Sequence, residues 1–234
     1  MNRSQVIGEI NTRVSLTKSF SYDGSTSTGP GNPTSFKGVA STFNSNNQVT
    51  NAGFSYDGNG NPTTYTSVGT IFDPENRLLQ TNRAGLTEVY TYDGDGHQVL
   101  QNAYGLVKSQ PRLLYYKLYD GENLVSLYGA ANLTSPPAVS RTNTVGADGL
   151  ISVCNTIAST FYTFDERGNV AQRLDNAASV QSSDVYDASG KVTTTISNIT
   201  DFVGFGGQVG YYTDNYLSLV PCTHRYYDPK KCAG

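Results

Sequence analysis

The sequence predicts an all-β protein made of stacked antiparallel β-hairpins, and three observations carry this prediction. The chain holds 17 Tyr, 9 Phe and 24 Gly in 234 residues, a composition typical of strands and turns. Hydrophobic residues make up only 37%, so aromatic side chains must supply much of the buried area. A short aromatic–aspartate motif also recurs along the chain. Together these features exclude a coiled coil and a helical bundle.

Each copy of the motif consists of an aromatic or aliphatic residue, one spacer, Tyr or Phe, Asp, and then Gly or Asn within a few residues. Phe54-Ser55-Tyr56-Asp57-Gly58 is one copy. The closest copies lie 16 to 22 residues apart, which leaves room for two short strands and two turns. The aromatic residues directly before the aspartates are Tyr22, Tyr56, Phe72, Tyr92, Tyr119, Phe164, Tyr186 and Tyr227. The aspartates are Asp23, Asp57, Asp73, Asp93, Asp120, Asp165, Asp187 and Asp228.

The spacing within the motif indicates a strand that ends in a hairpin turn. Residues i and i+2 of a strand share a face, so we expect Tyr90 and Tyr92 to point the same way. The aspartate can then accept hydrogen bonds from turn amides, and Gly or Asn can adopt the positive φ that reverses the chain. We therefore expect the eight aromatic residues to be structural and the eight aspartates to cap turns, rather than to act as the acids of a hydrolase.

Two parts of the chain resemble a known family. Phe72-Asp73-Pro74-Glu75-Asn76-Arg77-Leu78, followed by Tyr90-Thr91-Tyr92-Asp93, is similar to two consecutive YD repeats of Rhs proteins. The C-terminal part resembles the Rhs repeat-associated core domain, because a glycine-rich stretch is followed by Arg-Tyr-Tyr-Asp-Pro. The residues of this core motif are Gly206, Gly207, Gln208, Arg225, Tyr226, Asp228 and Pro229.

The resemblance implies a fold, an organisation and a setting. In Rhs, Tc-toxin and teneurin proteins, YD hairpins form a curved or spiralling β-sheet strip, which is shell-like and hollow. In bacterial members the shell encloses a toxin polypeptide, which would be the partner here, in a secreted or cell-surface context. No signal peptide is predicted in the first residues. We expect a YD-repeat strip over residues 1–128, an insertion or irregular connection over 129–160, and a core-like region over 161–234.

The end of the sequence departs from the family pattern. The core domain closes one end of the family's shell and in many members cleaves the chain, using aspartates downstream of a first Asp-Pro. Here Asp228-Pro229 is followed by Lys230-Lys231-Cys232, and a second Asp-Pro is absent. We therefore expect no autoproteolysis and no enzymatic activity.

Metal, cofactor, nucleic-acid and membrane functions are not predicted. Asp93-Gly94-Asp95-Gly96 superficially resembles a calcium loop, but the twelfth position, where an EF-hand needs Glu, is Tyr104. Cys222, His224 and Cys232 lack the spacing of a zinc finger, so a disulfide or free thiols explain the cysteines better. A net charge of −3, with 15% charged residues, gives no basic face for nucleic acid. No stretch approaches the roughly 18 apolar residues of a membrane helix.

Two functions from different classes remain. The first is a non-enzymatic shell segment that encloses or displays a partner or toxin polypeptide, on its own or after self-assembly. The alternative is a surface module for carbohydrate binding or adhesion, because stacked aromatics beside Asn and Asp can hold sugars. A buried aromatic row favours the scaffold, whereas an exposed row favours the sugar-binding module.

Overall fold

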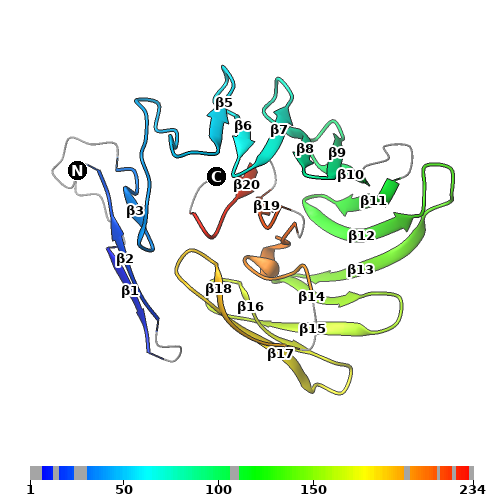
Figure 1. Ribbon diagram of the computed structural model, residues 1–234. Helices are drawn as coiled ribbons and strands as arrows, with labels where there is room; N and C mark the ends of the chain where they lie inside the picture. Colours follow the sequence, from blue (N-terminus) through cyan, green and yellow to red (C-terminus); the bar gives the residue numbers. More distant parts are fainter. Residues whose placement is uncertain are drawn as a thin grey trace. The chain divides into compact units, whose positions relative to one another are not determined.

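The computed structural model describes residues 7–12, 16–23, 31–105, 111–197, 201–214, 217–222 and 225–231 (Figure 1). Within these residues the regular structure consists of antiparallel strands and one short 3-10 helix. The chain forms two compact units, residues 1–70 and residues 71–234. Each unit is described separately.

Unit 1 contains a small sheet and a short meander. The order of the small sheet is β1-β2-β3-β4. Phe20 and Phe36 lie directly opposite each other on β2 and β3, with both side chains buried and their ring centroids 5.2 Å apart. The strands of the small sheet are β1 (Gly8–Asn11), β2 (Leu16–Ser21), β3 (Ser35–Phe36) and β4 (Val39–Ala40). The meander consists of β5 (Phe54–Tyr56), β6 (Pro62–Tyr65) and β7 (Val68–Phe72), whose last two residues belong to unit 2.

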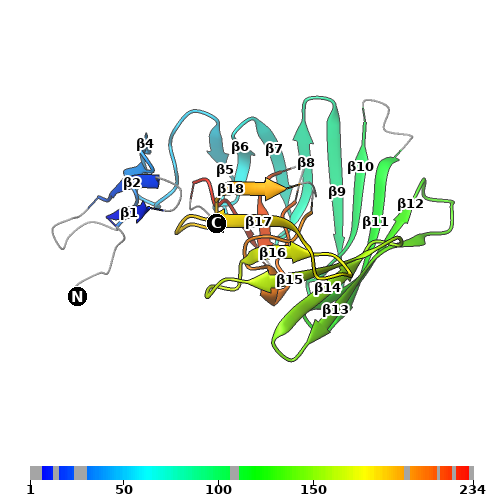
Figure 2. The ribbon, with the colours of Figure 1, turned by 90° about the horizontal axis from the view of Figure 1, so that it is seen from below.

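Unit 2 is a long antiparallel strip in which each strand pairs with its neighbours in sequence, from β8 to β18. Its first strands are β8 (Leu78–Arg83), β9 (Leu86–Tyr92), β10 (Gln98–Tyr104), β11 (Pro111–Asp120) and β12 (Asn123–Ala130). The remaining strands are β13 (Ala138–Gly146), β14 (Gly149–Cys154), β15 (Ser159–Phe164), β16 (Val170–Leu174), β17 (Val180–Tyr186) and β18 (Val192–Ser197). The strip curves, as the two views show (Figures 1 and 2). The predicted fold class, stacked hairpins in a curved strip, is therefore confirmed.

The register of the hairpins shifts beside the repeat aromatics. Tyr119 pairs with Leu124, but the preceding Leu118 pairs with Ser126, so one residue of the returning strand is skipped. The same shift occurs at Phe164 and at Tyr186. A bulge of this kind increases the local twist of a sheet, so its repetition gives the strip a reason to curve.

Residues 129–160 are the segment expected to be an insertion or an irregular connection. They contain all of β13 and β14, which form a regular hairpin across a turn at Gly146–Gly149. This hairpin lacks the aromatic–aspartate motif, so the motif does not predict it. The expected boundaries near residues 128 and 160 are likewise not those of the compact units, because β15–β18 continue the sheet of β8–β14.

The chain after β18 turns back onto the concave side of the strip (Figures 1 and 2). We call residues 201–231 the C-terminal segment. It contains a 3-10 helix, η1 (Gly207–Val209), and a hairpin of β19 (Val220–Cys222) and β20 (Arg225–Tyr227). Val203 of this segment is 2% exposed and joins Leu150, Val153, Tyr162 and Val170 in the core. The segment and the strip therefore share one hydrophobic core.

Candidate functional site: the inner face of the strip

The repeat aspartates lie at tight turns with a common geometry. In the turn after β15, the Asp165 carboxylate accepts hydrogen bonds from the backbone amides of Arg167 and Asn169, both at 2.9 Å. Gly168, the fourth residue of the turn, has a φ of 79°. Four more repeat aspartates accept hydrogen bonds from the amides two and four positions further along their own turns: Asp57, Asp73, Asp93 and Asp187. Asp175, which is not part of the motif, makes the same two contacts.

Three of the repeat aspartates are placed differently. Asp23 accepts hydrogen bonds from the amides of Gly31 and Asn32, eight and nine positions further along the chain. Asp120 is the last residue of β11 and pairs with Asn123. Asp228 is buried and accepts the amide of Lys230 at 2.7 Å. Five of the eight repeat aspartates therefore share one turn geometry, and the other three depart from it.

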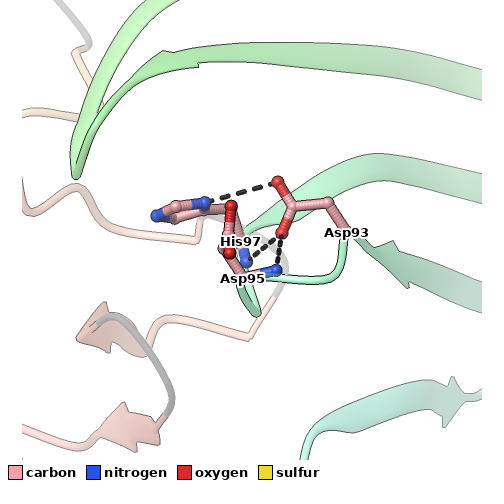
Figure 3. A group of neighbouring side chains, drawn as sticks. All are labelled: Asp93, Asp95 and His97. Atoms are coloured by element: carbon pink, nitrogen blue, oxygen red, sulfur yellow. Dashed lines mark hydrogen bonds and ion pairs between the residues drawn. The ribbon is translucent and has the colours of Figure 1, made fainter.

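The group formed by Asp93, Asp95 and His97 has the composition of a metal site (Figure 3). His97 Nδ1 lies 3.3 Å from Asp93 Oδ2. Asn61 and Asn169 occupy the equivalent position in their turns, and each donates its side-chain amide to the aspartate in the same way. The His97–Asp93 contact is thus the general turn contact with a different donor, and the turn explains it without an ion. His224 and Cys232, the other metal candidates, lie outside the described residues.

The eight repeat aromatics, Tyr22, Tyr56, Phe72, Tyr92, Tyr119, Phe164, Tyr186 and Tyr227, are all half-buried. The hydroxyls of two of them bond the backbone of the preceding repeat: Tyr92 donates to the Leu78 carbonyl at 2.9 Å, and Tyr119 to the Gln98 carbonyl at 3.3 Å. Burial raises the pKa of Tyr92 to about 12. These rings connect successive hairpins, which is a structural use of a half-buried side chain.

The glycine-rich part of the core motif fits closely against the strip. The Gly206 amide donates to Asn169 Oδ1 at 3.0 Å, and the Gln208 amide to the Gly168 carbonyl at 3.0 Å. A side chain on Gly207 would clash with Val203 and Val170, since its Cβ would lie 2.5 Å and 2.9 Å from their methyl carbons. Glycine is therefore needed at this position for close packing.

The Arg-Tyr-Tyr-Asp-Pro part of the motif contacts two distant turns. Tyr226 accepts a hydrogen bond from Gln98 Nε2 at 3.0 Å, whereas Tyr227 donates to the Ser189 carbonyl at 2.9 Å. Ser189 in turn donates its hydroxyl to the Pro229 carbonyl at 2.7 Å. Arg225 is exposed. The motif thus joins the beginning and the end of the strip in unit 2.

A buried polar cluster, which we call the lysine cluster, lies under the first half of the C-terminal segment. Lys117 Nζ donates to Tyr212 Oη at 2.6 Å and also to Gln98 Oε1. Burial lowers the pKa of Lys117 to about 8, although Asp214 and Glu88 oppose the shift. Glu88 is 2% exposed, and burial and Asp214 raise its pKa. Burial therefore disfavours the charged forms of both Lys117 and Glu88 in this cluster.

A second buried polar cluster, which we call the arginine cluster, is centred on Arg173 of β16. Arg173 binds the Asp184 carboxylate at 2.6 Å, Asp201 at 3.4 Å and the Val203 carbonyl at 2.5 Å. Burial opposes the charge on Arg173, but the two carboxylates outweigh it and hold its pKa above the usual value. Tyr162 adds a 2.5 Å hydrogen bond to Asp201. Sequence reasoning missed both clusters, because the contributing residues carry no motif and lie on strands that only the fold brings together.

The fold and this lining define a class: a curved strip of β-hairpins that holds a segment of its own chain on its inner face. No protein-family model matches the chain, and no curated protein matches it by sequence. None of the helices in the described part of the chain could span a membrane.

Solved structures of toxin complexes share the fold. The Photorhabdus luminescens Tc holotoxin pore matches with a TM-score of 0.66 and 16% identity over 92% of this chain and 11% of that chain. A crystal structure of TcdB2-TccC3 without its hypervariable C-terminal region matches with a TM-score of 0.64 and 14% identity, over 92% and 12%. A structure of TcdB2-TccC3-Cdc42 matches with a TM-score of 0.59 and 13% identity, over 92% and 10%. The chain therefore spans about a tenth of the length of these proteins.

Proposed function

We propose that this chain is a non-enzymatic structural segment of an Rhs/YD-repeat shell, and that the shell encloses or displays a partner or toxin polypeptide. The observation that carries the proposal is the inner face, where Arg173, Lys117 and Gln98 of the strip donate hydrogen bonds to a carbonyl and two tyrosine hydroxyls of the C-terminal segment. Such contacts suit a wall that holds a polypeptide against its inner face. The toxin names of the structures that share the fold point in the same direction.

The absence of enzymatic activity is part of this proposal. Asp228 is the aspartate of the core motif, and its carboxylate accepts a hydrogen bond from the amide of Lys230. A self-cleaving site needs carboxyl groups that face a scissile bond, whereas this carboxylate has a turn-capping partner. We expect the intact mass to stay at 25.2 kDa during prolonged incubation. A time-dependent loss of mass that Asp228→Asn abolishes would contradict this part of the proposal.

Carbohydrate binding is the second candidate, because one cavity of about 210 Å³ has an aromatic lining. Tyr92, Tyr119 and Tyr226 contribute to this lining, together with His97 and Glu122. The His97 and Tyr119 rings stack on each other with centroids 4.8 Å apart, so each ring already has a partner on one face.

A saccharide array, probed with the native chain and with Tyr119→Ala, separates the two candidates. The shell proposal predicts no saccharide signal from either protein. A signal that disappears in Tyr119→Ala, while Tyr128→Ala retains it, would establish the carbohydrate-binding module instead.

A further inference from the structure

A second cavity, of about 200 Å³, lies in unit 2 between the strip and the C-terminal segment. Leu124 and Leu127 of β12 line it together with Phe202, which is 38% exposed and places the cavity at the surface. Lys117 and Tyr212 also line it. The side chain that carries the Lys117 amine is therefore part of the wall of a largely apolar cavity.

The amine of Lys117 donates to Gln98 Oε1 and Tyr212 Oη, and the charged side chains of Arg141 and Asp214 line the same cavity. Tyr212 Oη lies 2.6 Å from Lys117 Nζ, and Asp214 lines the same cavity. Asp214 is 6% exposed and accepts the Leu217 amide at 3.1 Å. A phenol beside the amine and a carboxylate in the same wall can accept and return protons. The shell proposal needs none of this chemistry.

We propose that Lys117 is a reactive amine that captures small apolar aldehydes as imines. The nitrogen lone pair forms a bond to the carbonyl carbon, and the π electrons move to oxygen, which takes a proton. The resulting carbinolamine then loses its oxygen as water, which carries both original N–H protons, and a C=N bond remains. The reaction consumes one amine and one aldehyde and releases one water, so it requires no oxidant or reductant.

The lining selects the substrate class. Leu124, Leu127 and Phe202 offer hydrocarbon surface to a phenyl or short alkyl group, and a cavity of about 200 Å³ limits its size. Burial supplies the reactive form, since it lowers the pKa of Lys117 to about 8. An amine with that pKa is neutral about 200 times more often at pH 7.5 than a lysine with the ordinary value near 10.4.

Reductive trapping tests the proposal on the full chain. The protein is incubated at about pH 7.5 with benzaldehyde and cyanoborohydride, and peptide mass mapping measures the alkylation rate at each lysine. We expect Lys117 to react at least tenfold faster than the exposed Lys191, with Lys117→Arg losing the fast site alone. A rate at Lys117 equal to or below that at Lys191, or labelling only in urea, would overturn the proposal.

Two further measurements show whether the cavity is the route. Leu127→Trp fills the cavity and should lower the rate at Lys117 at least tenfold while the rate at Lys191 stays the same. Benzyl alcohol, which has the same ring but no carbonyl, should slow Lys117 in the native chain without affecting Lys191. Labelling of Lys117 that neither change slows would contradict capture in the cavity.

Discussion

The lysine cluster and the arginine cluster hold the same C-terminal segment in different ways. Lys117 offers a compact charge to Tyr212 and Gln98, and its burial disfavours that charge by lowering the pKa of the amine to about 8. Arg173 offers a planar group that binds two carboxylates and a carbonyl at once, so its charge is fixed. The difference predicts that the buried cation with directly bound carboxylates contributes more to stability than the buried cation without them.

The largest expected effect comes from removing the fixed charge. Arg173→Met leaves Asp184 buried without its cation and Asp201 with only Arg141, 3.9 Å away, and should lower the free energy of unfolding by about 3–5 kcal/mol. Chemical denaturation measures this value. Because Lys117→Met removes a charge that burial already disfavours, we expect it to cost much less. Equal losses in the two variants would remove the distinction between the clusters.

Close packing of the segment against the strip gives the next effect. Gly149 has a φ of 108°, and a Cβ there would lie 2.0 Å from the Gln208 carbonyl oxygen. Gly149→Ala should therefore cost about 2–4 kcal/mol, as strain and displacement of η1. Gly121→Ala is the matched control, since Gly121 has a φ of 55° and no atom within 4 Å of its Cβ position. The control should cost about 1 kcal/mol in the same denaturation experiment.

The pH dependence of stability separates the clusters without any loss of packing. Between about pH 8 and pH 10 the unfolded chain keeps the Lys117 proton that the folded chain releases, so stability should rise with pH. The slope should approach 1.4 kcal/mol per pH unit at most. Above about pH 10 the unfolded tyrosines ionise first, because burial raises the pKa of Tyr92, Tyr119 and Tyr162 in the folded chain, and stability should fall.

Denaturation midpoints measured from pH 7 to pH 11 check this profile. The rise should be absent in Lys117→Met and retained in Arg173→Lys. A native profile that is flat or falling between pH 8 and pH 10 would contradict the lowered pKa of Lys117 in the folded chain.

The smallest effect tests the repeat itself. Asp165→Ala removes the acceptor of two backbone amides and of the Asn169 side chain, and should cost about 1–2 kcal/mol. Asp120→Ala, at an exposed hairpin end, should change the free energy of unfolding by less than about 0.5 kcal/mol. If the two substitutions cost the same, the turn geometry is not what the aspartate stabilises.

The sequence predicts the strands and turns of this architecture but few of the contacts between distant residues. The spacing around Tyr92 and Asp93 indicates a strand and its turn, because both are decided by residues within five positions. Lys117 and Tyr212 are 95 positions apart, and no local pattern predicts their contact. The β13–β14 hairpin lacks the motif and was therefore expected to be irregular. Contacts that depend on the curvature of the whole strip became visible only in the fold.

Hydrogen exchange of the C-terminal segment tests the central claim most directly. The account predicts that the Gly206 and Gln208 amides, which bond Asn169 and Gly168, exchange as slowly as those of β16. Arg173→Met should accelerate their exchange before that of β9 and β10. Exchange of these amides at the rate of an unstructured peptide in the native chain would contradict the claim that the inner face holds this segment.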